Sequence, residues 1–153
     1  MNLWTAHATH SLSEEIPAAP DAVRNFYVDL DNIKVVHPLV VSVQTISREE
    51  NADGYQQTYR VRDRIPFGPL AMRITYWARV EVPRHGAVST QARQFPGVRL
   101  NGSVRFEPVG SGTRLTERLT IAAPRPLAAM TVREAVSAHA AMLAGIRSHF
   151  ESR

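Results

Sequence analysis

Cysteine is absent from all 153 residues. Its absence excludes disulfides, thiolate metal sites, iron–sulfur clusters and cysteine nucleophiles. Lysine is almost absent as well, because Lys34 is the only one and arginine supplies the rest of the positive charge. The formal net charge is only +4, so we interpret the preference for arginine mainly as a compositional bias of the source genome.

The sequence also lacks long apolar runs and targeting signals. No apolar stretch approaches the ~18 residues of a membrane span. The start, MNLWTAHATHSLSEE, has neither a basic segment nor an apolar core, so we expect no signal peptide and a cytoplasmic protein. The length fits a single domain over residues 1–153, which can bury roughly 70% of its unfolded surface.

Motifs for metals, phosphates and nucleophiles are missing too. His7 and His10 are three apart in a predicted strand, so they point to opposite faces and cannot share an ion. With no cysteine and no helical H-E-x-x-H, a metal site is excluded. The glycines in GSG and FPG have no strand–loop–helix setting and indicate hairpin turns. No serine has the spacing of a catalytic triad.

The elements that are present follow a simple order. Residues 4–16 suit a long strand that PAAP ends, and a short helix follows from Pro20 to Tyr27. A second short helix begins with Asp31 and Asn32 as caps and stops at Pro38. Period-two alternation with tight turns then predicts an antiparallel meander of six strands, at 41–49, 55–65, 70–82, 87–94, 98–107 and 113–122.

The last segment, 127–150, predicts a long helix with one apolar face. At about 100° per residue, a single stripe contains Val132, Ala135, Val136, Met142, Leu143, Ile146 and Phe150. The fold class is therefore α+β: a curved seven-stranded antiparallel sheet with two short helices and a long C-terminal helix, which together enclose a cavity.

This chain resembles the START-like helix-grip superfamily (SRPBCC), which includes polyketide cyclases and lipid-binding proteins. The most specific segment is SEEIPAAPDAVRNFYVDLDNIKVVHPLV, which is similar to the first strand, corner and helix pair of that family. The resemblance implies an apolar ligand held between the sheet and the long helix. Some members only bind, while others cyclise, aromatise or dehydrate polyketide-like substrates without cofactors. Aromatase/cyclase members often have Trp-Pro where this chain has His37-Pro38.

Three ionisable residues occupy positions that the pattern assigns to the apolar interior. Asp63 shares strand parity with Tyr59, Val61 and Ile65, and Glu117 goes with Leu115, Leu119 and Ile121. His139 lies at the centre of the apolar stripe of the long helix.

Further residues are predicted to face the same volume. His10 shares parity with the apolar residues of the first strand, and His37 stands at the end of the second helix. The predicted ligand-binding residues are His10, His37, Tyr59, Tyr76, Met72, Ile74, Leu100, Phe106, Val136 and Leu143.

Burial of an unpaired charge costs several kcal/mol, and burial of a neutral polar group roughly 1–3 kcal/mol. Taken singly, each ionisable residue also fits a structural role: Asp63 and Glu117 either pair with arginines at the cavity rim or cap loop amides, and His139 is satisfied in the core. Their coincidence favours catalysis by His139, Glu117 and Asp63 in a cofactor-free aldol cyclisation or dehydration. The alternative is a non-catalytic binder or carrier of lipid-like molecules.

The predicted outer face of the sheet is rich in arginine. Glu81 and Glu107 are interleaved, and Trp77 is the only outward aromatic residue, which argues against a nucleic-acid or anionic-membrane footprint. The expected partner is a small hydrophobic or aromatic ligand, without nucleic acid or stable membrane insertion. Trp77 marks either a homodimer contact or a lone surface aromatic.

Overall fold

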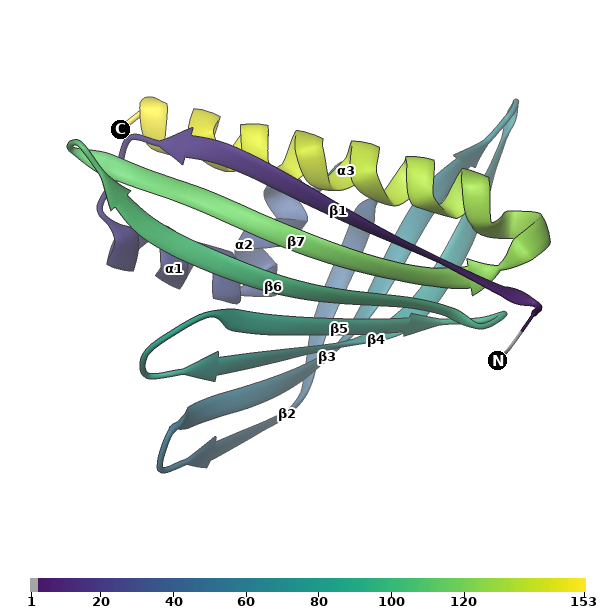
Figure 1. Cartoon of the computed structure of the whole chain (residues 1–153), viewed down its shortest axis with the longest axis horizontal. Coiled ribbons are helices and arrows are strands. Elements are labelled where there is room, and N and C mark those ends of the chain that lie inside the picture. The colour runs from purple at the N-terminus through teal and green to yellow at the C-terminus, as the bar shows by residue number, and fades with distance from the viewer. Residues whose placement is uncertain (1–2) are drawn as a thin grey trace.

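The computed structural model describes residues 3–153, and the order of its elements confirms the predicted α+β architecture (Figure 1). A strand and two short helices are followed by six strands and a long helix. Their bounds are β1 (Thr5–Ile16), α1 (Pro20–Val28), α2 (Leu30–Val36), β2 (Val40–Asn51), β3 (Gly54–Phe67), β4 (Leu70–Pro83), β5 (Val88–Gln94), β6 (Val98–Val109), β7 (Gly112–Pro124) and α3 (Arg125–Glu151).

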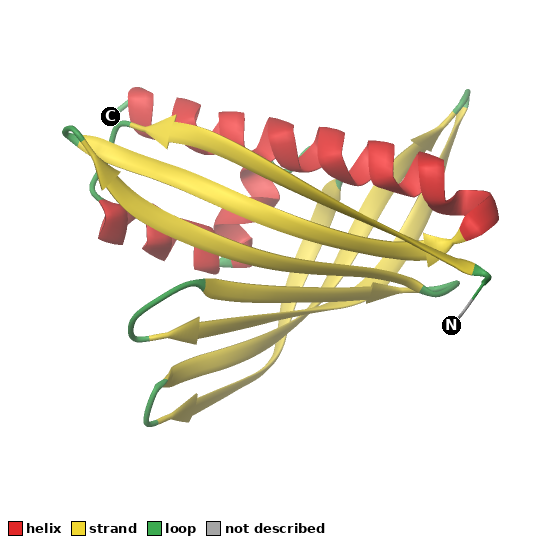
Figure 2. Ribbon diagram, in the orientation of Figure 1, coloured by secondary structure: helices red, strands yellow, loops and turns green. Residues whose placement is uncertain are grey.

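All seven strands form one antiparallel sheet in the order β1-β7-β6-β5-β4-β3-β2. The sheet curves around the three helices, and α3 runs along its length (Figure 2). α3 packs mainly on β1 and β7 and also touches α2, while α1 packs on β6 and β7. The joint between β4 and β5 is short, because only five residue pairs connect them, from Trp77 to Glu81 on β4.

The helix pair α1 and α2 positions the segment around His37, which lines the site described below. Pro20 lies in the first turn of α1, where its missing N–H is not needed. The predicted caps of α2 are wrong: the helix begins one residue earlier, and the side chain of Asp29 accepts from the N–H of Asp31 at 3.0 Å. The helix ends where the N–H of His37 reaches the carbonyl of Ile33 at 2.8 Å and Pro38 prevents continuation.

The long helix α3 approaches α2 closely at Gly145. A Cβ placed on Gly145 would lie 3.0 Å from the Cβ of Val36 and 3.3 Å from its carbonyl oxygen. The buried face of α3 is formed by Ala138, Met142, Leu143 and Ile146. None of the helices within residues 3–153 is long and apolar enough to cross a membrane.

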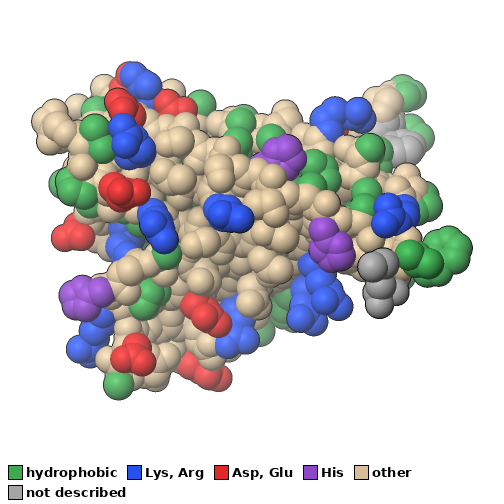
Figure 3. All heavy atoms as spheres, viewed as in Figure 1, with side chains coloured by type: hydrophobic (Ala, Val, Ile, Leu, Met, Phe, Trp, Pro, Cys, Tyr) green, Lys and Arg blue, Asp and Glu red, His purple; other side chains and the backbone are tan. Residues whose placement is uncertain are grey.

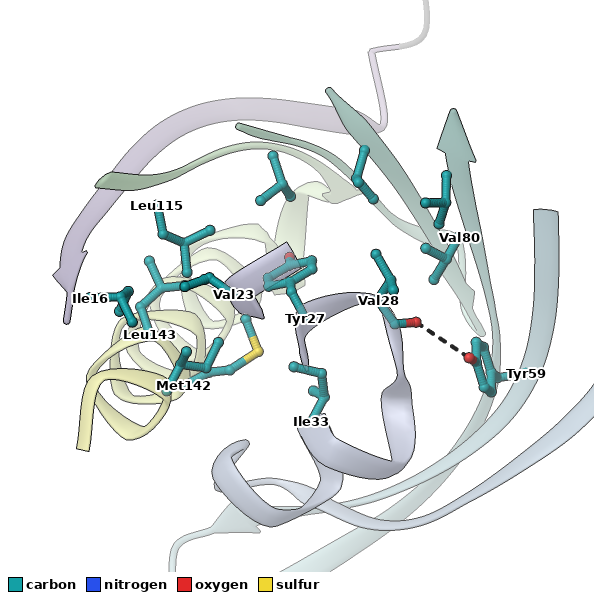
Figure 4. Close-up of a cluster of buried hydrophobic side chains, with 14 of the residues drawn as sticks. Ile16, Val23, Tyr27, Val28, Ile33, Tyr59, Val80, Leu115, Met142 and Leu143 are labelled. Carbon is teal, nitrogen blue, oxygen red and sulfur yellow. Dashed lines mark hydrogen bonds between the residues drawn. The ribbon is translucent and has the colours of Figure 1, made fainter. Parts of the chain in front are cut away.

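The hydrophobic core joins α1, α3 and the inner face of the sheet (Figure 4). Ile16, Val23, Leu115, Leu143 and Ile146 are each at most 1% exposed. Full burial of one such side chain stabilises the fold by about 1.5–3 kcal/mol.

The interior pattern fails near the turn between β3 and β4. Leu70 and Met72, which were predicted to point inward, are 71% and 42% exposed. The alternation of side chains continues there, but this end of the hairpin makes no extensive contact with a helix. His10 is also exposed, so the prediction that it lies inside is wrong. It belongs to β1, an edge strand that pairs on one side only.

We expect the substitution Gly145→Leu to lower the free energy of unfolding by about 1–3 kcal/mol, because its side chain overlaps α2 and overpacks the contact. Urea denaturation measures the loss. Ala144→Leu, at the exposed neighbouring position, is the matched control for helix propensity. Equal stabilities of the two variants would contradict the close contact of α2 and α3.

Candidate functional site

The centre of the candidate site is the carboxylate of Glu117, which is 0% exposed on the inner face of β7. The hydroxyl of Tyr27 on α1 donates a hydrogen bond to its Oε2. Nδ1 of His139 on α3 lies 2.6 Å from its Oε1. Both oxygens of one buried carboxylate therefore have partners, and each partner comes from a different helix.

These partners determine which nitrogen of His139 carries the proton. Burial and the neighbouring Glu117 raise the pKa of Tyr27 well above its ordinary value, so this hydroxyl stays protonated and donates. The Glu117 carboxylate accepts, so Nδ1 of His139 must also donate. In the neutral ring the lone pair then lies on Nε2, as it does in carboxylate-oriented catalytic histidines.

His37 has the opposite polarity. Its Nδ1 accepts a hydrogen bond from the backbone N–H of Leu39 at 3.2 Å, so the neutral ring carries its proton on Nε2. Burial and repulsion from His139 lower the pKa of His37 to about 3. The rings of His37 and His139 meet edge to face, with centroids 5.4 Å apart. With both rings neutral, Nε2 of His139 is therefore an acceptor, and Nε2–H of His37 is a donor.

A second polar pair comes from β3 and β4. Burial raises the pKa of Asp63 to about 6, although a hydrogen bond from Tyr76 and the charge of His139 act in the other direction. Burial and the Asp63 carboxylate also raise the pKa of Tyr76. Within residues 3–153, Oδ1 of Asp63 is the buried side-chain oxygen without a hydrogen-bond partner. Such an atom costs about 1–3 kcal/mol and is uncommon in structures without a functional reason.

A cavity of about 90 Å³ lies between α2, α3 and strands β2–β6. The polar side chains of Tyr27, His37, Tyr76 and His139 reach its wall. Most of the other lining side chains are apolar, and they include Leu30, Ile33, Val40, Val43, Val61, Ala78, Val80, Ala92, Leu100 and Met142. The cavity therefore presents a few polar groups within an apolar surface, as ligand sites commonly do.

Four of the sequence-predicted site residues line this cavity: His37, Tyr76, Leu100 and His139. Glu117 and Asp63 lie directly behind these residues. Glu117 is hydrogen-bonded to His139, and Asp63 is hydrogen-bonded to Tyr76. The site therefore brings together the three ionisable residues that strand parity and helix periodicity placed inside.

The remaining predicted ligand-binding residues lie elsewhere. Tyr59 is buried in the core, where its hydroxyl donates to the carbonyl of Val28 at 3.4 Å. Leu143 and Phe106 pack in or against the same core, and Ile74 and Val136 are half-buried outside the cavity wall. His10 and Met72 are exposed. Inward parity alone does not separate the core from the cavity wall.

Sequence reasoning missed Tyr27, the second partner of Glu117. The available signal was its spacing, since Tyr27 follows the fully buried Val23 by four residues on the inner face of α1. Val40 and Val43 were missed because the β2–β3 register shifts between Val40 and Ser42, and this irregularity is invisible to strict alternation.

Comparison with known proteins decides the family. The polyketide cyclase/dehydrase and lipid transport family matches residues 7–151. The chain belongs to this family. No curated protein matches the sequence.

Several solved structures share this fold. TTHA0849 of Thermus thermophilus shares 19% identity with a TM-score of 0.75, over 95% of this chain and 98% of that one. The two-domain aromatase/cyclase StfQ of the steffimycin biosynthetic pathway shares 17% identity with a TM-score of 0.75, over 96% of this chain and 52% of StfQ. The ZhuI aromatase/cyclase of Streptomyces shares 17% identity with a TM-score of 0.64, over 97% and 95% of the two chains. At these identities the likeness shows a common helix-grip fold.

The lowered pKa of His37 predicts a loss of stability in acid. Its pKa is about 6.5 in the unfolded chain and about 3 in the folded one, so the unfolded state binds more protons between these values. Stability therefore falls as the pH drops below about 6.5. Asp63 acts in the opposite direction, because its pKa is about 6 in the folded chain and 3.8 in the unfolded one, so the stability that it contributes is lost as the pH rises between these values.

When the pH falls from about 7 to about 4.5, we expect the free energy of unfolding to decrease in the wild type by about 1–3 kcal/mol more than in His37→Gln. Urea unfolding at the two pH values measures this difference. His85→Gln, on the exposed turn after β4, controls for the removal of an imidazole elsewhere. An identical acid dependence in wild type and His37→Gln would contradict burial of a neutral His37.

Proposed function

We propose that this protein is a cofactor-free cyclase or dehydratase that acts on a compact hydrophobic β-hydroxy or β-keto carbonyl compound. The observation that carries the proposal is the arrangement Glu117–His139–His37 at the wall of an apolar cavity. The family includes cyclases and dehydrases, and this membership supports the same reaction class.

The first step is removal of a proton from the carbon next to a carbonyl group. Nε2 of His139 accepts this proton, and the carboxylate of Glu117 stabilises the imidazolium that forms. Nε2–H of His37 donates to the carbonyl oxygen as negative charge develops on it. The donor is a neutral imidazole, which the low pKa of His37 provides at neutral pH.

Two outcomes follow from the enolate. In a cyclisation, its carbon bonds to a second carbonyl carbon of the same molecule, and the resulting alkoxide takes the proton from His139. In a dehydration, the β-hydroxyl leaves as water after it receives a proton, and the carbon–carbon double bond forms. Asp63, whose pKa of about 6 keeps part of its population protonated near neutral pH, is the proposed donor to that leaving hydroxyl. The imidazolium of His139 then loses its proton to solvent, and the carboxylate of Asp63 takes one up, which restores both groups.

The size of the cavity limits the substrate. Pockets for drug-sized ligands measure about 300–1,000 Å³, whereas this cavity measures about 90 Å³. It holds the reacting portion of a molecule, and a polycyclic substrate requires that α2 move away from the sheet.

A carrier of lipid-like molecules is the second candidate. The apolar residues that dominate the cavity wall favour it, and the family description includes lipid transport. The two candidates differ in the role of the polar residues, because a cyclase or dehydratase needs a general base whereas a lipid carrier does not.

The cyclase proposal predicts that His139→Ala and Glu117→Gln each lower turnover by about 10²–10⁴-fold, because each removes part of the base. The probe is an aromatic β-hydroxy ketone, whose dehydration extends its conjugation and increases its near-ultraviolet absorbance. His149→Ala is the matched control, since His149 lies on the same helix but packs against Phe26 and Phe150. Wild-type turnover in both site variants would refute the proposal.

Native mass spectrometry of freshly purified protein separates the two candidates. A co-purified aromatic or polyketide-like molecule supports the cyclase, while a mixture of fatty acids supports the carrier.

A further inference from the structure

The outer face of the sheet has a continuous group of arginines. In the strand register, Arg60, Trp77, Arg93 and Arg99 lie side by side across β3, β4, β5 and β6. Arg62, Arg64 and Arg73 continue the group toward the turn between β3 and β4, where Arg64 is paired directly with Arg73. We call this group the arginine patch: Arg60, Arg62, Arg64, Arg73, Arg93 and Arg99 around Trp77.

The carboxylates of the outer face lie away from the patch. Glu81 lies four residues beyond Trp77 on β4 and pairs with Arg79 at 3.4 Å. Glu107 lies opposite Arg114, near the other end of the strands. Among residues 3–153, none of the patch arginines forms an ion pair with a carboxylate. In the strand register, Glu81 and Glu107 therefore lie beside the arginine patch and not within it. On the face that Figure 3 shows, the red side chains lie mostly toward the end where α3 finishes, whereas blue side chains occur at both ends.

Exposed apolar side chains occupy the same end as the patch. Phe95, in the turn between Arg93 and Arg99, is 90% exposed. Leu70, the first residue of β4, is 71% exposed, and Trp77 at the centre of the patch is 52% exposed. The β3–β4 and β5–β6 turns both lie at the end of the molecule where α3 begins (Figure 1). Large exposed apolar side chains beside arginines that have no carboxylate partner are typical of a surface that binds a partner.

We propose that this end of the protein docks peripherally on an anionic lipid surface. The arginines and Trp77 on the outer face contact the headgroup layer, while the hairpin tips at Phe95 and Leu70 enter the boundary between headgroups and acyl chains. A lipid surface fits better than a nucleic acid, because phosphates alone would satisfy the arginines and leave the two apolar tips in water. The inference does not depend on the proposed reaction, since none of these residues lines the cavity.

The test is sedimentation of the full chain with vesicles of phosphatidylcholine alone or mixed equally with phosphatidylserine. We expect binding to the mixed vesicles only, with an affinity that falls as salt is added. The double variant Arg64→Glu/Arg73→Glu should bind at least about 25-fold more weakly, at about fivefold per arginine. Arg105→Glu/Arg118→Glu, with the same change in net charge, should bind within about twofold of the wild type. These two outward arginines lie closer to the carboxylate end of the sheet.

A second variant tests the apolar tips. Leu70→Ser/Phe95→Ser should weaken binding while the salt dependence stays unchanged, because charge is preserved. In a Trp4→Phe background, Trp77 is the sole tryptophan, and its fluorescence should shift to the blue on the mixed vesicles. Thermal unfolding and circular dichroism confirm that each variant is folded.

Four results would overturn the proposal. They are absence of binding to mixed vesicles, equal binding to neutral vesicles, equal loss in the two charge-reversal variants, and unaltered binding by the Ser variant. Retention on single-stranded DNA that the Arg64→Glu/Arg73→Glu variant loses, with no vesicle binding, would reassign the patch to nucleic acid.

Discussion

Glu117 places a carboxylate with no exposed surface inside an apolar sheet, and the arrangement of the site depends on how that group is satisfied. An isolated buried charge costs several kcal/mol, so both oxygens need partners. Tyr27 supplies one from α1 and His139 supplies the other from α3. The same two hydrogen bonds therefore fix both helices relative to β7. They also point the second nitrogen of His139 away from the carboxylate.

Around this carboxylate, burial shifts the other two ionisable groups toward their neutral forms. The pKa of Asp63 rises and the pKa of His37 falls, and burial is the larger cause in both cases. Repulsion from His139 adds to the shift of His37, so the two imidazoles cannot readily be charged together. The neutral His37 owes its fixed donor side to a backbone N–H, that of Leu39 just beyond Pro38. The corner after α2 thus sets the orientation of the His37 ring as well as the path of the chain.

Elements and inward parity could be predicted because they depend on local pattern. Asp63, Glu117 and His139 were found in this way, since each is a polar residue in an otherwise apolar series. Met72 and His10 were misplaced because strand parity predicts the face on which a side chain lies but not whether a helix covers that face. Both residues are exposed. Tyr27 was missed because an aromatic residue on the buried face of a helix is ordinarily part of the core. The separation of charge on the outer face depends on register across four strands, which no single stretch of sequence contains.

The short joint between β4 and β5 has a mechanical consequence. Between Leu70 and Tyr76, β4 pairs with β3 but has no partner in β5, so the seven strands are two ribbons joined over five residue pairs. Glu117 lies on the ribbon that contains β7, and the helices that supply its partners Tyr27 and His139 pack on that ribbon. Asp63 and Tyr76 belong to the other ribbon. Rotation about this joint would change the distance between the two polar groups and the volume enclosed between them. Glu117 with His139, and Asp63 with Tyr76, would each keep their own hydrogen bond during such a rotation, while the space between the two ribbons changed.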